Sequence, residues 1–462
     1  MTAINRWLYK ISFTSKPIAP LVVFRMLFGI MMFFSTLRFI NKGWVKDLYI
    51  TPKYFFTYYG FDWITPFNEN GMYLLFFILL VSSILITIGL FYKFSTSLFF
   101  LAFTYVELID KTNYLNHYYF ISLVAFVLIF LPANKMFSLD IYFGLTKKEK
   151  HVPAWNINII KFQLGLVYFF AGIAKLNYYW LFEAQPLTNW LKHQTDLPIF
   201  GSIMQYHETA FIFSWCGALF DLCIPFVLLN KKFRIYGYLF VIFFHGITSA
   251  MFPIGVFPFV MIVSTLIFFS DNFHLKILQL LRKIFPANSI KKEVYFRNQH
   301  FISKKTITIM LVLFVSIQLL LPFRYTLYDG NLFWTEQGFR FSWRVMLIEK
   351  VGYAQFFIHD PKSGKKKLIN NNLFLTRQQE KMMATQPDMI LQFAHHLRDI
   401  YTDTIITERN GEKIHLKKPK VTAEVYVSLF NKGSTLFIDP NINLAEIKRG
   451  HHQKEWILGY EK

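Results

Sequence analysis

Nine stretches of apolar side chains run through the first two thirds of this chain, with short polar segments between them. A membrane-spanning helix needs about 20 apolar residues, so the pattern predicts a predominantly α-helical, polytopic membrane helix bundle of eight or nine spans. The stretches within 97–132 and 235–270 are short and closely spaced, which is typical of bent or re-entrant helices and leaves the number of spans open by one. The nine stretches cover residues 19–39, 71–92, 97–115, 117–132, 157–176, 210–229, 235–252, 254–270 and 305–322.

The pattern changes after Pro322, where apolar and polar residues begin to alternate. Alternation with a period of two predicts strands, and a longer run with helical period predicts an amphipathic helix. We therefore expect two domains, a transmembrane domain over residues 1–322 and a small soluble α+β domain over residues 323–462. In the second domain we expect strands at 423–429 and 435–438, a turn at 431–433 and a helix at 378–399.

Composition supports a membrane protein, because 54% of the 462 residues are hydrophobic, 19% are aromatic and the mean hydropathy is +0.33. A formal net charge of +21 could suggest a nucleic-acid partner. The basic residues, however, gather in short loops between apolar stretches, which is the topology pattern of a polytopic protein. The sequence therefore predicts membrane lipid as a partner and excludes nucleic acid.

The distribution of Lys and Arg over the loops also predicts the orientation. Loops rich in basic residues face the cytoplasm, and here they include residues 135–150 and 276–305, whereas the loops 40–70, 110–116 and 177–209 are poor in them. The helix ends that carry His117, Lys175 and Ala250 are then expected on the extracytoplasmic side. The domain that follows Pro322 is expected on the same side.

Lys175 ends the apolar stretch that begins near Ile157, at a depth where membrane helices seldom carry a charge. Removal of an ammonium group from water favours the neutral amine, and a neutral amine is a base. The alternative is that the side chain snorkels to the outer interface through its methylene groups. The residue pattern alone leaves both interpretations open.

Other polar residues interrupt the apolar stretches and have structural as well as functional interpretations. Asp110 and Lys111 could form an ion pair at the membrane interface. His117 and His245 could be site residues or could each hydrogen-bond a neighbouring helix. Arg25, inside the first span, pairs more readily with a carboxylate or a lipid headgroup than with a substrate.

Several kinds of chemistry are not indicated. Cys216 and Cys223 lie seven residues apart in one apolar segment, about 10 Å along a helix, which is too far for a disulfide. No His-x-x-His or His-Glu-x-x-His pattern occurs, and the pair His451-His452 is expected to be solvated, so no metal ligands are predicted. Phosphate-loop, dinucleotide and Gly-x-Ser-x-Gly patterns are also absent from the sequence.

Six segments, collinear and similarly spaced, carry a resemblance to a known family. The chain resembles the vitamin K-dependent γ-glutamyl carboxylase family and its bacterial relatives with a horizontally transferred transmembrane (HTTM) domain. The matching segments are Asp110-Lys111-Thr112, Asn116-His117-Tyr118, Tyr168-Phe169-Phe170-Ala171-Gly172 with Lys175-Leu176, Phe244-His245, residues 257–261 and Phe341-Ser342-Trp343.

The resemblance implies that residues 1–322 are the catalytic domain and that Lys175 is its base. In that family the free amine deprotonates reduced vitamin K. Oxygen then adds, and a strong base forms that removes a glutamate γ-proton, so that carbon dioxide is captured and the epoxide leaves. His117 and Asn116 match residues that orient or stabilise oxygenated intermediates. By the same resemblance, reduced vitamin K of menaquinol or phylloquinol type is expected beside His245, Tyr118 and Phe169.

The sequence departs from the family pattern at the expected substrate site and near the end of the tail. Arg324 and Tyr325 stand where the family has Ser-His. Arg340, Arg344 and Trp343, together with Tyr325, could still hold a substrate carboxylate, although solvated surface arginines are an equal alternative. The tail stops soon after residues 437–440, where animal members continue, so propeptide-type recognition is not expected.

These observations favour a vitamin K-dependent carboxylase with quinol epoxidase activity in a bacterial inner membrane, with O2 and CO2 as co-substrates and no metal. Its partner would be a glutamate-containing peptide or protein on the extracytoplasmic side. An alternative is an epoxidase that lacks protein carboxylation or uses another acceptor. A third is a non-catalytic quinone- or lipid-binding membrane protein, for which Lys175 would be dispensable.

Overall fold

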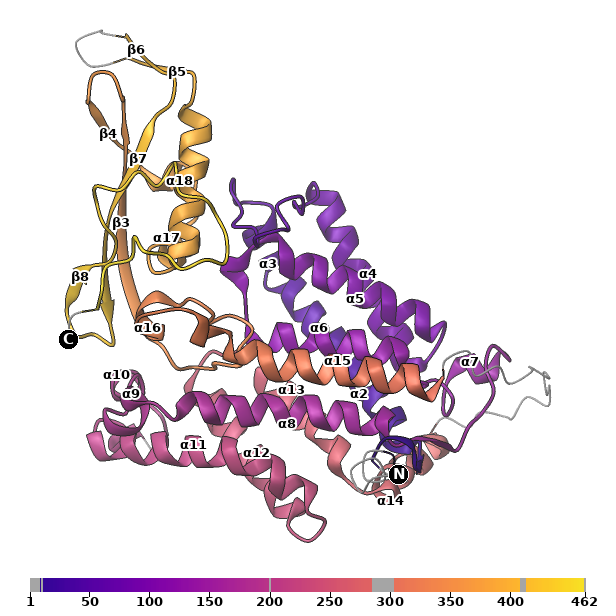
Figure 1. Cartoon of the computed structure of the whole chain (residues 1–462). Coiled ribbons are helices and arrows are strands. Elements are labelled where there is room, and N and C mark those ends of the chain that lie inside the picture. Colours follow the sequence, from indigo (N-terminus) through magenta and orange to yellow (C-terminus); the bar gives the residue numbers. More distant parts are fainter. Residues whose placement is uncertain (1–8, 10, 199–200, 285–302, 408–412, 461–462) are drawn as a thin grey trace.

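The computed structural model describes residues 9, 11–198, 201–284, 303–407 and 413–460, and each predicted apolar stretch forms a helix in it (Figure 1). The corresponding helices are α2 (Ala19–Asn41), α4 (Glu69–Ile88), α5 (Tyr92–Ile109), α6 (Asn116–Phe130), α8 (Trp155–Lys175), α11 (His207–Leu229), α12 (Arg234–Met251), α13 (Phe257–Thr265) and α15 (Lys304–Leu320).

Fewer of these helices are long and apolar enough to cross a bilayer than the sequence predicts. Among the described residues five qualify, namely α2, α4, α8, α11 and α15 together with its 3-10 extension η4 (Leu321–Leu327). A sixth is reached if α13 and η3 (Leu266–Phe268) count as one span with α14 (Asp271–Ile284), across a bend of 111°. The protein is therefore a helical membrane protein, and the predicted eight or nine spans are not confirmed.

Short elements gather at the two ends of the long helices (Figure 1). At the end where α2 and α8 begin lie α7 (Leu139–Tyr142) and a small sheet of β1 (Ser15–Pro17) and β2 (His151–Pro153). The opposite end carries α3 (Trp44–Tyr49), η1 (Lys111–Asn113), α9 (Tyr178–Phe182), α10 (Leu187–Leu191) and η2 (Gly201–Ile203).

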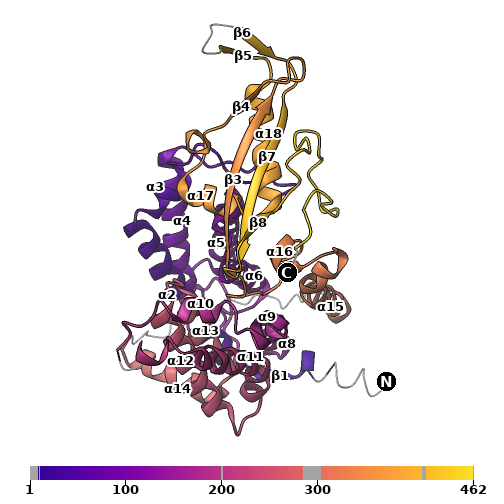
Figure 2. The ribbon, with the colours of Figure 1, turned by 90° about the vertical axis from the view of Figure 1, so that its left-hand side faces the viewer.

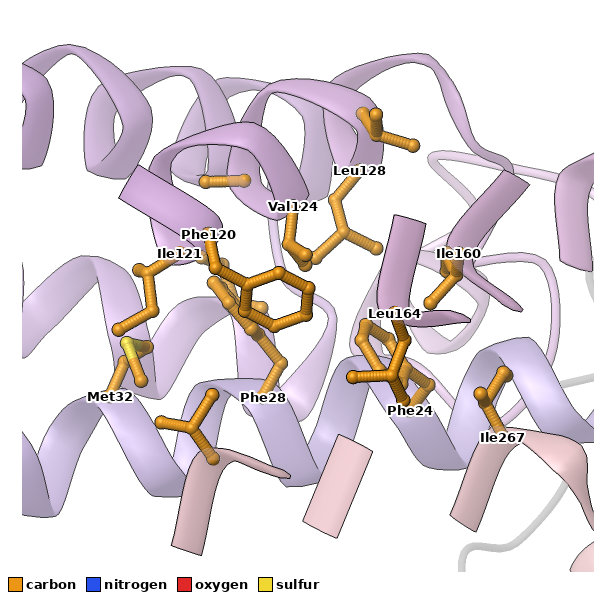
Figure 3. Packing of buried hydrophobic residues seen from close by; sticks show 14 of the residues in the cluster. Phe24, Phe28, Met32, Phe120, Ile121, Val124, Leu128, Ile160, Leu164 and Ile267 are labelled. Carbon is orange, nitrogen blue, oxygen red and sulfur yellow. The ribbon is translucent and has the colours of Figure 1, made fainter. Parts of the chain in front are cut away.

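The core of the bundle forms around α2, whose Phe24, Phe28 and Met32 lie beside α6 and α8 (Figure 3). Phe28 meets Phe99 of α5 edge to face, with ring centroids 5.7 Å apart. Gly29 allows α2 to approach α4 closely, because a Cβ built there would lie 2.7 Å from the carbonyl oxygen of residue 83. The sequence of α2 thus permits packing on several sides.

Arg25 of α2 is completely buried. Its guanidinium group donates to the carbonyl oxygens of Ala133, Thr87 and Phe137, at 3.0, 3.3 and 2.7 Å. The expectation of a carboxylate or headgroup partner is therefore wrong. The arginine instead satisfies backbone groups in the last turn of α4 and in the segment that follows α6, so it joins both of them to the first span.

The tail domain rises from one end of the bundle as an antiparallel sheet with two helices against it (Figure 2). The strand order is β4-β3-β7-β8, and Tyr353 of β3 faces Tyr426 of β7. Its elements are α16 (Leu332–Thr335), β3 (Lys350–His359), β4 (Lys366–Leu368), η5 (Asn371–Leu373), α17 (Arg377–Met383), α18 (Pro387–Tyr401), β5 (Thr404–Thr407), β6 (Lys413–Leu416), β7 (Lys420–Leu429) and β8 (Ser434–Leu436).

The two predicted strands are confirmed as β7 and β8, but the single helix predicted over residues 378–399 is wrong. The chain leaves the helix after Met383 and enters a second one at Pro387. Proline lacks the amide hydrogen that a continuous helix needs and suits the first position of a helix. Pro387 therefore divides the segment into α17 and α18.

The loops predicted to be poor in basic residues contact the tail domain. Tyr54 donates to the carbonyl oxygen of Gln392 at 3.3 Å, and Lys432 pairs with Glu183 at 2.6 Å. Asp110 and Lys111 do not pair with each other, contrary to one expectation. Asp110 accepts a hydrogen bond from Gln379 at 2.8 Å, and Lys111 pairs with a carboxylate of α18.

Candidate active site

Helices α8 and α11 approach closely at Gly172. A Cβ built on Gly172 would lie 2.7 Å from the backbone nitrogen of Leu222, so a larger residue would separate the two helices. One turn further along α8, Lys175 faces Asp221 of α11. The glycine thus sets the distance at which these two charged side chains meet.

The Lys175 Nζ lies 2.5 Å from the Asp221 Oδ2, and each residue is only 5% exposed. The ammonium end also lies 5.3 Å from the ring centroid of Trp180. Lys175 therefore points inward, and the snorkelling alternative does not describe it. Sequence inspection missed Asp221, although a carboxylate inside the apolar stretch 210–229 was visible as a signal.

The pair lies in the wall of a cavity of about 180 Å³ between α8, α11, α12 and α13. Most of the lining is apolar, with Val167, Phe244 and Met261 among the residues that form it. Because apolar walls exclude water, electrostatic interactions of the lysine and the aspartate are stronger here than at a surface. The arrangement therefore places a proton-carrying pair beside a dry, ring-sized space.

His245 of α12 also lines this cavity and is 1% exposed. Its Nε2 lies 2.9 Å from the Tyr168 hydroxyl group, and its Nδ1 has no partner among the described residues. A buried polar nitrogen without a partner is costly in an apolar wall. His245 is therefore part of the cavity wall, with one ring nitrogen beside the Tyr168 hydroxyl group and the other buried without a partner among the described residues.

The structure brings His117 and Asn116 close to this region but does not place them in the cavity lining. The His117 ring packs 5.7 Å from Phe257, and Phe257 also meets His245 at 5.6 Å. Asn116 donates to the carbonyl oxygen of Arg344 at 2.9 Å. One phenylalanine therefore separates His117 from the lysine cavity, and Asn116 joins α6 to the tail domain.

Tyr118 and Phe169 lie outside the cavity lining. The Tyr118 ring packs against Phe103 with centroids 5.9 Å apart. Phe169 is 36% exposed and meets Phe226 on the outer side of α8 and α11. The structure therefore does not bring these two residues together with Lys175 and His245.

The four predicted substrate residues already have partners within the chain. Trp343 is 1% exposed and stacks on Tyr119 at 4.9 Å. The Arg344 guanidinium lies 4.4 Å from the ring centroid of Tyr325. Arg340 is paired with an aspartate of α18 at 2.8 Å. The arginines are therefore not freely solvated, and these side-chain contacts lie within the tail domain.

The chain between Gly338 and Met346 forms one side of the cavity, because Val345 and Met346 belong to its lining. Phe341, Trp343 and Met346 have positive φ values of 61°, 59° and 54°. Such a conformation is uncommon for bulky residues and persists only where surrounding contacts hold it. We name residues 338–346 the partition segment.

Comparisons with known proteins give matches to both domains of the chain. The HTTM domain family model matches residues 13–273, which is more than half of the chain, and the model of the vitamin K-dependent gamma-carboxylase lumenal domain matches residues 303–462. No solved structure matches the chain. The second match implies a lumenal position for the tail domain. The chain belongs to the vitamin K-dependent gamma-carboxylase family with an HTTM domain.

Proposed function

We propose that this protein is an integral membrane carboxylase that uses reduced vitamin K, with its site and tail domain on the extracytoplasmic side of a bacterial inner membrane. Family membership suggests the gamma-carboxylase function. The observation that carries the proposal is the buried Lys175–Asp221 pair in the wall of an apolar cavity. A solvent-exposed lysine could not act as a base near neutral pH.

The residues of the cavity fit a naphthoquinol. Apolar side chains suit its rings, and Lys175 and His245 supply polar atoms at the wall. When bound, the quinol reacts with oxygen and supplies the strong base and the epoxide of the reaction. The chain's own residues bind this group, exclude water and accept its first proton.

Asp221 changes the role expected of the lysine. The two side chains share one proton, either as ammonium and carboxylate or as neutral amine and carboxylic acid. Removal of both charges from water disfavours the ionic form. We infer that Asp221 holds the proton while the Lys175 amine accepts the quinol proton, so that Asp221 is a positioning residue and Lys175 is the base.

His117 and Asn116 remain proposed participants, acting from behind Phe257 and from the start of α6. Substrate glutamate is proposed to approach through the partition segment, next to Trp343, Arg340, Arg344 and Tyr325. The contacts of these four residues within the chain favour a role in shaping the entrance. Direct contact with the substrate carboxylate is proposed for the arginine groups alone.

The first experiment measures epoxide formation by purified protein in lipid nanodiscs, supplied with reduced vitamin K and oxygen. Lys175→Ala is expected to lower the rate by about 100-fold or more, which is the usual size of a lost general base, and exogenous primary amine should restore part of it. Asp221→Asn should lower the rate roughly tenfold, comparable to one charge-assisted hydrogen bond. Wild-type protein without any epoxide formation would exclude the proposal.

Incorporation of labelled bicarbonate into glutamate peptides separates the carboxylase from its alternative. Epoxide without labelled peptide, over several peptide sequences, would favour an epoxidase that uses another acceptor. Unchanged epoxide formation in Lys175→Ala would instead show that another group is the base. Quinone binding by a wild-type protein that forms no epoxide would favour the non-catalytic quinone- or lipid-binding alternative.

A further inference from the structure

A second hollow lies where the tail domain meets the loops of the membrane domain, and we name it the junction cleft. It has a volume of about 130 Å³ and receives residues from both domains. Two carboxylates, Glu336 and Asp388, belong to its lining. The cations outnumber them by three, because five line the cleft: Lys111, Arg324, Arg340, Arg449 and Lys454.

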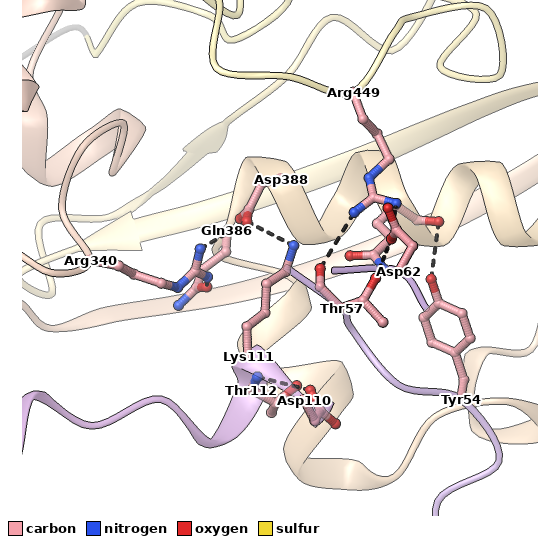
Figure 4. Close-up of polar contacts among 11 residues, drawn as sticks. Tyr54, Thr57, Asp62, Asp110, Lys111, Thr112, Arg340, Gln386, Asp388 and Arg449 are labelled. Atoms are coloured by element: carbon pink, nitrogen blue, oxygen red, sulfur yellow. Dashed lines mark hydrogen bonds and ion pairs between the residues drawn. The ribbon is translucent and has the colours of Figure 1, made fainter. Parts of the chain in front are cut away.

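Three of these cations have partners within the chain (Figure 4). Lys111 and Arg340 share Asp388, each at 2.8 Å, and Arg449 pairs with Asp62 at 2.7 Å. The first two contacts join η1 and Arg340 to α18, and the third joins the last segment of the tail to the loop before α4. These ion pairs give a carboxylate partner to three of the five cations, and the positive charges of Arg324 and Lys454 are left over.

Arg324 and Lys454 have no carboxylate partner among the residues that the structure describes. Arg324 donates to the carbonyl oxygen of Arg340 at 2.7 Å, and its Nε is buried without a partner. Glu336 is already paired with Lys350 at 2.9 Å. Asp388 attracts Lys454 only from beyond ion-pair distance. Partly buried cations without a close counter-charge are unfavourable, so an anionic ligand would stabilise both of them.

The lining favours a chain with several carboxylates over a compact anion. The cations come from separate segments of the two domains. Lys111 and Arg340 already meet at Asp388, Arg324 and Lys454 lie elsewhere in the lining, and five aromatic side chains line the cleft with them. A compact phosphate needs convergent donors, whereas an extended peptide can place carboxylates and apolar groups along such a surface. The aromatic residues are Tyr58, Tyr59, Tyr328, Phe339 and Phe341.

We propose that the junction cleft is a docking site for an acidic peptide, bound through carboxylates other than the one that reacts. The partition segment connects the two hollows, because residues 338–341 line the cleft and residues 345 and 346 line the lysine cavity. The docked peptide thus lies beside the wall of the cavity. This inference rests on the proposed function only for the choice of a peptide as ligand.

Binding is measured without quinol, so that it does not depend on catalysis. Full-length protein in zwitterionic phosphatidylcholine nanodiscs is titrated into a fluorescent peptide rich in glutamate, and fluorescence anisotropy is recorded. A counterpart with glutamine at every glutamate position is titrated in parallel. We expect the glutamate peptide to bind about tenfold more tightly or better, and to weaken as salt is added.

Lys454→Glu is expected to weaken this binding about tenfold, because repulsion replaces attraction at the cleft. Lys448→Glu is the matched control, since that lysine lies in the same segment but is exposed and outside the lining. Arg324→Gln and Lys454→Gln provide milder variants, and thermal unfolding reports whether each folds.

Equal binding of the two peptides, or wild-type affinity in both Lys454 variants and Arg324→Gln, would overturn the proposal. Displacement of the peptide by inorganic phosphate or by phosphatidylglycerol nanodiscs at comparable anion concentration would assign the cleft to those anions instead. If the wild-type protein binds the peptide but forms no epoxide, the proposed function is contradicted, whereas the docking site is still supported.

Discussion

Two lysine–aspartate pairs lie on either side of the partition segment, and they differ in what surrounds them. Lys175 and Asp221 are both 7% exposed at their side chains and face an apolar cavity. Lys111 is 4% exposed, but its partner Asp388 is 36% exposed and also binds Arg340. One pair is therefore a single lysine with a single carboxylate, whereas the other belongs to a cationic network.

The difference decides what each aspartate can do with a proton. Burial alone would raise the pKa of Asp388, but Arg340 and Lys111 hold that pKa well below its usual range. Burial lowers the pKa of Lys111 to about 8, against the attraction of Asp388. Asp388 thus stays ionised and fixes the domains, whereas Asp221 has one neighbour with which it can exchange a proton.

The largest loss of stability is expected from a substitution that breaks the ion-pair network at the junction cleft. Asp388→Asn removes the carboxylate shared by Lys111 and Arg340, which leaves two buried cations without a counter-charge. We expect the free energy of unfolding to fall by about 2–4 kcal/mol, less than for a fully buried pair because the Asp388 side chain is 36% exposed, measured by denaturant titration in nanodiscs. Asp399→Asn on the same helix is the control, because that exposed pair with Arg398 contributes at most about 1 kcal/mol. Equal midpoints for the two variants would contradict the structural role.

A second prediction separates the catalytic pair from general packing. Gly172→Ala should push α8 from α11 and destabilise the protein by about 1–3 kcal/mol, while also lowering epoxide formation through the displaced Lys175. Gly29→Ala meets comparable backbone contacts between α2 and α4, so it should cost similar stability. Its epoxide formation per folded molecule should stay unchanged. Equal losses of epoxide formation in both variants would contradict the inference that Gly172 sets the distance between Lys175 and Asp221.

The junction should also respond to acid. The folded pKa of Asp388 is depressed, so its contribution to stability is complete above its unfolded value and is lost as the pH falls through the folded value. Stability should therefore decline below about pH 4, by at most about 1.4 kcal/mol per pH unit for this one group. Unfolding midpoints across that range test this, and Asp388→Asn should show a shallower decline. An identical pH slope in the variant would contradict the assignment.

The smallest effect is expected at Phe169. Its ring lies on the outer side of the bundle, so Phe169→Ala should change the free energy of unfolding by less than about 1 kcal/mol, as surface substitutions usually do. Epoxide formation should remain within the error of the assay. A loss of epoxide formation as large as that of Lys175→Ala would contradict this prediction. It would support the position beside the quinol that the family resemblance implies for Phe169.

The helices were predictable because each apolar stretch carries a local pattern, and the strands at residues 423–438 were predictable for the same reason. The break before Pro387 was also predictable, because proline cannot continue a helix. It was missed because the helical spacing of apolar residues continues across it. Asp221 was visible in the sequence, but its pairing with Lys175 depends on the crossing of α8 and α11 at Gly172. Lys111 meets Asp388 across more than 200 residues, and Arg340 meets the same carboxylate across 48, so no local pattern could reveal the junction cleft.

Arg25 has a consequence for how the protein is made. Its carbonyl partners lie at residues 87, 133 and 137, so they are synthesised long after the first helix. Until then, the arginine lies in the first third of an apolar helix without these partners, and its cost is at most the value of about 2.5–3.5 kcal/mol for the centre of a bilayer. The first helix should therefore wait at the translocon until the ribosome has passed Phe137, and Arg25→Leu should release it into lipid early. Biogenesis of the N-terminal helices would thus be cooperative.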